Sequence, residues 1–298
     1  MLNARFKRYD LVFKRPAGTS RGVLNTKETW FLEIRDGHRW GIGECGILRG
    51  LSCDDRPDYE EKLAWTCAHI EQGEAYLYEQ LKEFPSIQIG LETAFRSLEA
   101  EHPFSIFPSA FTEGQQAIAI NGLIWMGDKA FMKQQIVEKI EQGFDCIKMK
   151  IGAIDFEAEL DLLAYIRREF TPEAIELRVD ANGAFAPSQA LERLKRLSEF
   201  DLHSIEQPIK QGQWQEMATL CDATPVPIAL DEELIGVFDS EEKQQLITNI
   251  QPQYIILKPS FIGGFRGTDE WISKAENQGV GWWVTSALES NIGLNAIS

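Results

Sequence analysis

Cysteine is scarce in this chain of 298 residues, and its positions form no recognisable motif. The five cysteines are odd in number and scattered, and no two of them have the CxxC spacing of a zinc or redox site. They are Cys45, Cys53, Cys67, Cys146 and Cys221. A disulfide-stabilised secreted fold is therefore not indicated, and we expect a protein of the reducing cytoplasm.

The sequence also lacks long apolar runs and an excess of positive charge. No apolar segment approaches the roughly 18 residues of a membrane span. The first segment, MLNARFKRYDLVFKR, alternates apolar and basic residues as a strand does, unlike a signal peptide. Lysine and arginine number 30 against 46 aspartates and glutamates, which gives a formal net charge of −16. This balance argues against binding to nucleic acid or to an anionic membrane, because both need a basic surface.

What is present divides into two regions of different pattern. Residues 1–115 begin with strand-like segments and continue with helical ones, as in a compact α+β domain. The predicted strands are 5–14, 28–35 and 39–45, with the hairpin signal Asp36-Gly37 between the last two, and the predicted helices lie near 59–82 and 90–101. We expect residues 116–298 to form a second, larger domain.

A strand followed by a helix recurs throughout this second region. Comparable strand positions lie 23 to 30 residues apart, which is the length of one βα unit of a parallel α/β fold. These positions are Ala119, Ile147, Leu177, Ile205, Ile228, Ile256 and Trp283. An open doubly wound sheet is the competing fold, but it would gather its polar site at one switch point. Polar residues end many of these strands, which favours a TIM-type (β/α) barrel.

Seven such strands are visible, and the sequence ends in LESNIGLNAIS, at the start of what resembles a seventh helix. We therefore expect a barrel whose final, eighth strand is not present in this chain. Either the chain is part of a longer protein, which we favour, or the barrel closes in an unusual way.

Two lysines share one face of the second barrel strand. In Ile147-Lys148-Met149-Lys150-Ile151 the side chains alternate, so both lysines point to one side and the apolar residues to the other. Lysines directed into a barrel are unfavourable unless they pair with negative charge. Taken alone, such a pair is more often two solvated lysines at an exposed strand end.

Carboxylates at the ends of the next three strands change that interpretation. Asp180, Glu206 and Asp231 each end a strand, so a barrel brings them to one rim. Three like charges there require a cation, and carboxylate oxygens suit Mg²⁺, with Mn²⁺ possible. No histidine occupies a comparable strand end, so zinc is disfavoured. Lys258 ends the sixth strand, so amines flank the predicted metal site on two sides, where a partly desolvated lysine can act as a base.

Taken in order, these motifs resemble the enolase superfamily and, within it, the muconate-lactonising subgroup. The matching segments are KMK at 148–150, DAN at 180–182, EQP at 206–208, DEE at 231–233 and LKP at 257–259. The resemblance implies a modified TIM barrel with an N-terminal α+β capping domain. It also implies that Asp180, Glu206 and Asp231 bind the metal, with Glu232 and Glu233 as alternatives for the third ligand.

The resemblance further implies roles for the lysines. Lys150 is expected to be the acid/base that moves a proton next to a carboxylate. Lys148 is the partner that keeps Lys150 able to release its own proton, and Lys258 is the lysine on the opposite face.

Four further residues are expected to contact the substrate. Ser286 ends the seventh strand, Arg21 lies in the capping loop, and Arg178 and Asn182 share the inward face of the third strand. Arg178 is equally compatible with positioning Lys150 or with stabilising the carboxylate cluster, and Arg21 with a solvated loop position.

Within the subgroup, segments 18–24, 121–123 and 286–290 most resemble one dehydratase branch of menaquinone biosynthesis. The resemblance implies a metal-dependent hydro-lyase that removes water, in a syn reaction, from a small carboxylate. Its substrate would be a cyclohexadiene with a ring carboxylate, a neighbouring hydroxyl and a succinyl arm. A racemase of N-acylamino acids or an epimerase of dipeptides would use the same metal and lysines, and a non-catalytic binding barrel is a third alternative. The oligomeric state stays open.

Overall fold

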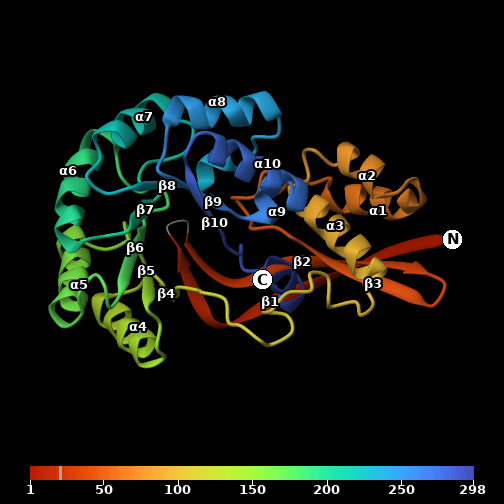
Figure 1. Cartoon of the computed structure of the whole chain (residues 1–298), viewed down its shortest axis with the longest axis horizontal. Helices are drawn as coiled ribbons and strands as arrows, with labels where there is room; N and C mark the ends of the chain where they lie inside the picture. The colour runs from red at the N-terminus through yellow and green to blue at the C-terminus, as the bar shows by residue number, and fades with distance from the viewer. Residues whose placement is uncertain (20–21) are drawn as a thin grey trace.

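The computed structural model describes residues 1–19 and 22–298, which form two units that meet along one side (Figure 1). The N-terminal unit, on the right of Figure 1, is an antiparallel sheet with helices packed beside it. The second unit, on the left, is a parallel sheet that curves within an arc of helices. The predicted α+β capping domain and (β/α) barrel are both confirmed.

The capping sheet is built from two long strands and a shorter one. In the described residues its strands are β1 Leu2–Thr19, β2 Gly22–Asp36 and β3 Arg39–Gly46, in the order β1-β2-β3. The first two are longer than predicted and pair up to the end of their ribbon, where Thr19 lies opposite Gly22. This end of the ribbon reaches toward the barrel (Figure 1). Gly37, with a φ of 60°, allows the tight turn that Asp36-Gly37 predicts.

The helices of the capping unit differ from the prediction at their boundaries. They are α1 Tyr59–Ala68, a 3₁₀ turn at Ile70–Gln72, α2 Glu74–Gln80 and α3 Pro85–Glu99. The single stretch predicted near 59–82 is interrupted at Gly73, whose φ of 84° is not helical. α3 begins earlier than predicted because a proline is favoured in the first turn of a helix. It packs so closely on β3 that a Cβ at Gly43 would lie 1.9 Å from the carbonyl oxygen of Gly90.

The second unit contains, among the residues described, seven parallel strands in the spatial order β10-β9-β8-β7-β6-β5-β4. They are β4 Gly122–Ile124, β5 Cys146–Lys150, β6 Glu176–Asp180, β7 Ser204–Glu206, β8 Ile228–Leu230, β9 Tyr254–Leu257 and β10 Gly281–Val284. Sequence neighbours are also neighbours in space throughout, whereas a doubly wound sheet reverses its order at a switch point. The open-sheet alternative is therefore wrong. β4 and β10 are the two edges, so the barrel is open where an eighth strand was predicted to be missing.

Helices alternate with these strands, and α4 to α8 line the outer side of the curved sheet (Figure 1). The helices are α4 Lys129–Glu141, α5 Phe156–Glu169, α6 Pro187–Leu197, α7 Trp214–Ala223, α8 Ser240–Ile250, α9 Pro259–Ile262, α10 Gly264–Asn277 and α11 Asn291–Ile297, with 3₁₀ turns at Ser198–Phe200 and Glu232–Leu234. Asp128, Asp155 and Asp239 cap α4, α5 and α8 by accepting N–H groups of the first turn. Across the described ranges, no helix has the length and apolar character needed to cross a membrane.

Buried apolar residues form one cluster in each unit of the described chain. In the barrel, Ile147 and Met149 of β5 are fully buried in this core, so Lys148 and Lys150, which alternate with them, lie on the other face of the strand. The two clusters are separated by the segment between α3 and β4. The predicted domain boundary at residue 115 falls within this segment and stays a prediction.

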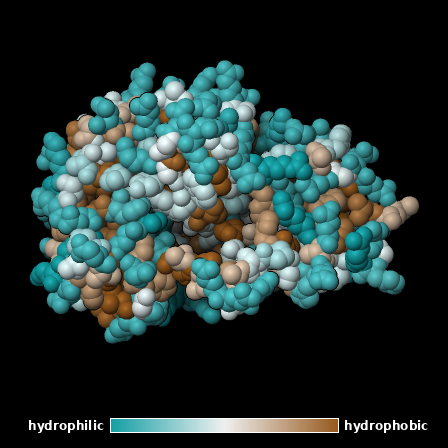
Figure 2. All heavy atoms as spheres, in the orientation of Figure 1, coloured by the Kyte–Doolittle hydropathy of each residue, from teal (hydrophilic) through white to brown (hydrophobic). Residues whose placement is uncertain are grey.

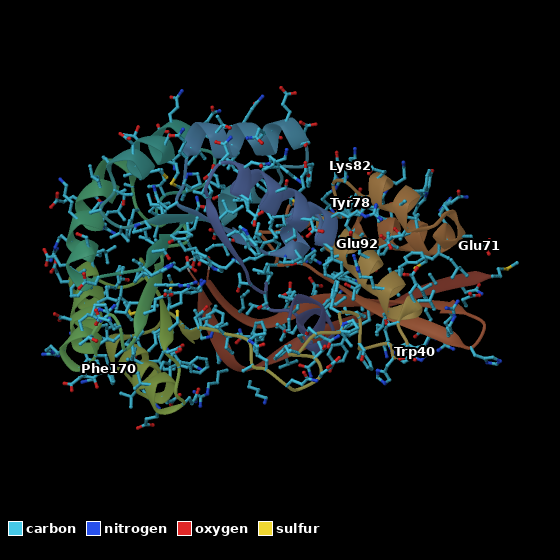
Figure 3. All side chains as sticks on the ribbon, viewed as in Figure 1. Trp40, Glu71, Tyr78, Lys82, Glu92 and Phe170 are labelled. Atoms are coloured by element: carbon cyan, nitrogen blue, oxygen red, sulfur yellow. The ribbon has the colours of Figure 1, made fainter. Side chains whose placement is uncertain are left out.

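Glu92 and Tyr78 join the capping unit to the barrel. Glu92 on α3 is only 2% exposed. It accepts the backbone N–H groups of Phe265 at 2.6 Å and Arg266 at 3.2 Å, at the start of α10. Tyr78 on α2 donates to the carbonyl of Gly263 at 2.7 Å. Figure 3 labels both side chains on the part of the capping unit that faces α9 and α10. A buried carboxylate therefore caps a barrel helix from the other unit.

The titration of Glu92 should make the stability of the protein depend on pH. Burial raises the pKa of Glu92 from 4.5 to about 7 and outweighs the two backbone hydrogen bonds, with Glu74 raising it further and Arg266 lowering it. The folded state therefore holds this proton more tightly than the unfolded state. The resulting stabilisation is complete below about pH 4.5 and is lost as the pH rises through about 7.

We expect the free energy of unfolding of the wild-type protein, relative to Glu92→Gln, to fall by on the order of 2–3 kcal/mol between pH 5 and pH 8. The glutamine variant keeps an acceptor for the two N–H groups but does not titrate. Urea unfolding of both proteins at each pH measures the difference. A difference that stays constant with pH would contradict the assignment.

Candidate active site

A cavity of about 660 Å³ lies between the inner face of the barrel and the capping unit. Leu24, Leu48 and Leu51 of the capping unit give it an apolar wall. Figure 2 shows apolar residues gathered around the middle of the molecule, where the two units meet. Several residues predicted from the sequence line the opposite wall: Lys148, Lys150, Arg178, Asp180, Asn182, Lys258 and Ser286. The cavity therefore suits a small molecule with an apolar body and an anionic group.

β5 places its two lysines among carboxylates. The ammonium of Lys150 donates to Asp180 at 2.7 Å and to Oδ1 of Asn182 at 2.9 Å. The ammonium of Lys148 donates to Glu206 at 2.6 Å and lies 3.7 Å from Asp180. The side chain of Lys148 is 13% exposed and that of Lys150 is 11% exposed, so both lysines form buried ion pairs. The solvated strand end, the alternative left open above, does not fit this arrangement.

The three predicted metal ligands lie side by side at one rim. Asp180 and Glu206 are the last residues of β6 and β7, Asp231 directly follows β8, and the three are 1%, 2% and 3% exposed. Lys258, at the end of β9, forms an ion pair with Asp231 and lies 3.7 Å from Glu206. The three carboxylates thus follow one another around the rim, with the lysines of β5 on one side and Lys258 on the other, as predicted for a barrel.

Charge within this cluster is unevenly neutralised. Burial acts to raise the pKa of Asp180, but the neighbouring ammonium groups outweigh it and hold this pKa well below its ordinary value. At Asp231, burial outweighs the ion pair with Lys258, and Glu232 and Glu206 add to its effect, so the pKa lies well above its ordinary value. The pKa of Lys258 is raised, because Asp231 and Glu206 outweigh the lowering effect of burial. A further cation near the end of β8 would relieve the repulsion from Glu232 and Glu206 that helps to raise the pKa of Asp231.

The chemistry of the three carboxylates fits a divalent metal ion. Carboxylate oxygens are the ligands that Mg²⁺ prefers, and Oε1 of Glu206 is buried without a hydrogen bond from any described residue. As placed, no three His, Cys, Asp or Glu side chains of the described chain stand close enough to enclose an ion. The ammonium groups of Lys148 and Lys258 lie between the carboxylates instead. The assignment of Asp180, Glu206 and Asp231 as metal ligands stays a prediction.

The acidic residues that follow Asp231 have different partners. Glu232 accepts a hydrogen bond from the amide of Asn182 at 3.1 Å, beside the lysine cluster. Glu233 accepts hydrogen bonds from Gln207 at 3.0 Å and from a backbone N–H of the loop after β7. Of the two alternatives for the third metal ligand, Glu233 is thus engaged elsewhere. Asn182, predicted to contact substrate, is held between Glu232 and Lys150 in this structure.

The two other described residues predicted to contact the substrate do not join the cluster of lysines and carboxylates. Arg178 donates to Glu176 at 2.6 Å, and its guanidinium lies over the ring of Trp283 at 4.5 Å from the ring centre. Among the described residues it makes no hydrogen bond to Asp180 or Asn182, the partners of Lys150, so its role in positioning Lys150 stays a prediction. Ser286 lines the cavity, while Arg21 lies outside the described residues.

Sequence reasoning missed two residues near this site. Trp283 was used only as a position of the seventh predicted strand, yet it lines the cavity and faces Arg178. Gln207 was quoted only as the middle letter of EQP. Strand alternation could have placed Trp283 on the same face as Thr285, two residues further on, which also lines the cavity. No sequence pattern indicates which residues the side chain of Gln207 contacts.

Comparison with known proteins shows which family and which solved structures this chain resembles. The family described as "Enolase C-terminal domain-like" matches residues 132–297. The o-succinylbenzoate synthase of Desulfotalea psychrophila is 46% identical over 98% of this chain and 88% of its own length. The crystal structure of MenC from Desulfotalea psychrophila LSv54 superposes with a TM-score of 0.87 and 41% identity, covering 99% of this chain and 89% of that one. The o-succinylbenzoate synthase of Thermosynechococcus elongatus BP-1, solved with Mg in its active site, gives a TM-score of 0.77 at 23% identity, covering 99% and 88%.

Proposed function

The chain belongs to the enolase superfamily, and from this premise we propose that it is an o-succinylbenzoate synthase of menaquinone biosynthesis. The observation that carries the proposal is its identity with the Desulfotalea psychrophila enzyme over nearly the whole chain. The reaction is the syn dehydration of a cyclohexadiene that bears a ring carboxylate, a neighbouring hydroxyl and a succinyl arm. An enzyme with this activity is a metal-dependent hydro-lyase that acts on a small carboxylate.

Asp180, Glu206 and Asp231 would hold Mg²⁺, which when bound supplies a Lewis acid for the ring carboxylate of the substrate. The buried position of these carboxylates at one rim supports the assignment. Mn²⁺ as an alternative metal and the cytoplasmic location stay predictions. Ser286, Arg178 and Arg21 stay candidates for binding the rest of the substrate.

Lys150 carries the proton transfers in the proposed mechanism. In its neutral form it takes the proton next to the carboxylate, and the electrons of that bond form the new ring double bond as the hydroxyl leaves. The resulting ammonium returns the proton to the departing hydroxyl, so water is released and the lysine is neutral again. The ammonium of Lys148 lies near Asp180, the carboxylate that Lys150 contacts, so the two lysines share one negatively charged partner.

Lys258 acts from the far side of the cavity. Its ammonium stabilises the negative charge that develops on the substrate when the proton leaves. One lysine is enough for a syn elimination, because the proton and the hydroxyl leave from the same face. Lys258 therefore needs no proton exchange with the substrate in this reaction.

Racemisation of N-acylamino acids, or epimerisation of dipeptides, is the second candidate. It is favoured by the placement of Lys150 on β5 and Lys258 near β9, which are separated in the sheet by three other strands in the described chain. Two lysines that reach one cavity from different strands could each serve as the acid on one face of a substrate.

A paired assay of the chain with Mg²⁺ separates the two candidates. One arm follows the loss of the cyclohexadiene chromophore, and the other follows deuterium entering the α-position of N-acylamino acids of each hand. We expect fast dehydration with slow or no exchange. Fast exchange from both enantiomers without dehydration would replace the proposed function by racemisation.

A further inference from the structure

Gln207 has no part in the mechanism above, yet it lies between the proposed metal ligands and is 0% exposed. It follows Glu206 directly at the end of β7. Its backbone N–H donates to the carbonyl of Ala229 in β8 at 2.9 Å, and its carbonyl accepts the N–H of Gly183 at 2.7 Å. Gly183 belongs to the loop after β6. The backbone of this one residue thus joins the ends of the three strands that carry Asp180, Glu206 and Asp231.

The side chain of Gln207 adds a second set of links. Its Oε1 accepts the backbone N–H groups of Asp231 at 3.1 Å and Glu233 at 3.3 Å. Its Nε2 donates to the carbonyl of Ile209 and to Oε2 of Glu233, both at 3.0 Å. A carboxamide offers two acceptor sites and two N–H groups, so every hydrogen-bonding group of this side chain is used. The orientation of the amide is set by donors on one side and acceptors on the other.

The backbone of Gln207 is also held in an uncommon conformation. Its φ of 39° lies in the left-handed region, which favours glycine and is unfavourable for residues that carry a Cβ atom. Such a conformation persists when the surrounding contacts determine it, and it is frequent where a site must be positioned. The hydrogen bonds described above supply those contacts.

We propose that Gln207 is a positioning residue that holds Glu206 and Asp231 in the relative arrangement required for Mg²⁺ binding. The proposal rests on the function proposed above. The amide oxygen of Gln207 accepts the backbone N–H of Asp231, so it fixes the backbone position from which the Asp231 carboxylate extends. The backbone of Gln207 fixes the position of the adjacent Glu206. Residues that hold metal ligands in place typically contribute 10–100-fold to metal affinity.

Gln207→Glu tests this with little change in shape. The glutamate keeps an oxygen for the N–H groups of Asp231 and Glu233 but places its second oxygen against Oε2 of Glu233 and the carbonyl of Ile209. Both contacts change from attraction to repulsion. The matched control is Gln253→Glu. Gln253 accepts the N–H of Ile228, at the other end of β8, at 2.9 Å and donates to the carbonyl of Cys221 at 3.2 Å.

Isothermal titration calorimetry with MgCl₂ and no substrate gives the readout, and circular dichroism confirms folding. We expect the Kd for Mg²⁺ to rise about 10–100-fold in Gln207→Glu and to stay within about twofold of the wild-type value in Gln253→Glu. A wild-type Kd in folded Gln207→Glu, or an equal loss in both variants, overturns the proposal. If Gln207→Glu does not fold, Gln207→Asn decides, because it keeps the amide but withdraws it by one carbon. A wild-type Kd there likewise overturns the proposal.

These outcomes can be separated from a failure of the proposed function. Metal binding is measured without a reaction, so a wild-type protein that binds Mg²⁺ but does not dehydrate its substrate would refute the function alone. The comparison of Gln207 with Gln253 would still be decided by the two Kd values.

Discussion

Replacing Lys150 by methionine should lower kcat for dehydration by about a thousandfold or more and leave the fold intact. Lys150 is proposed both to take the substrate proton and to return it to the leaving hydroxyl, so the variant loses general base and general acid together. Each function typically contributes 10²–10⁴-fold. Methionine keeps an unbranched chain in the buried position next to Asp180. Chromophore loss at saturating Mg²⁺ measures kcat, and circular dichroism confirms the fold.

The matched control is Lys243→Met. Lys243 is as well buried, at 4% exposed, and pairs with Glu270 at 2.5 Å, between α8 and α10. Its loss removes a buried ammonium without touching the cavity, so it should lower the melting temperature while kcat stays within about twofold of wild type. Turnover at the wild-type rate in folded Lys150→Met would exclude its role. An equal loss in both variants would point to a general effect of removing a buried charge.

The barrel and its polar rim could be predicted because both follow from repetition along the chain. Alternation within a strand places Lys148 and Lys150 on one face, and parallel strands bring their carboxyl ends to one rim. Asp180, Glu206, Asp231 and Lys258 could therefore be expected to meet although they are far apart in sequence. The absence of a histidine at a comparable strand end disfavoured zinc, and the carboxylates favoured a hard metal ion.

The partners of individual side chains could not be predicted in this way. Asn182 and Arg178 were both expected at the substrate, but which neighbour a polar side chain selects depends on the distances between strands. In the structure Asn182 accepts from Lys150, and Arg178 lies against Trp283. In the sequence, Glu92 is one residue of a predicted helix in the N-terminal domain. Only the packing of α3 on α10 shows that its carboxylate accepts the N–H groups at the start of a barrel helix. Contacts of this kind depend on tertiary structure, which local pattern does not determine.

The helix boundaries in the capping unit could not be predicted from the sequence for a related reason. The apolar pattern near 59–82 continues through Gly73, but that residue adopts a positive φ and separates two helices. Glycine is compatible with a helix interior and with a break, and packing decides between them.

Glu206→Gln should raise the Kd for Mg²⁺ by more than about 100-fold. The substitution removes a charged metal ligand, which should cost more affinity than the loss of a residue that only holds a ligand in place. Glu206 is the middle carboxylate of the rim, in contact with Lys148 at 2.6 Å and 3.7 Å from Lys258. The neutral amide cannot balance these two ammonium groups, so metal binding and dehydration should be lost together. Calorimetry with MgCl₂ measures the first, and the chromophore assay the second.

Glu159→Gln provides the comparison for Glu206→Gln. Glu159 is a buried carboxylate, 1% exposed, that accepts the N–H of Gly152 at 2.6 Å in the loop after β5. It stands near the same rim but is not a proposed ligand. Its amide keeps an acceptor for Gly152, so Mg²⁺ affinity should change by less than about tenfold. If Glu206→Gln binds Mg²⁺ as tightly as Glu159→Gln does, then Glu206 is not a metal ligand, and the proposed ligand set is wrong.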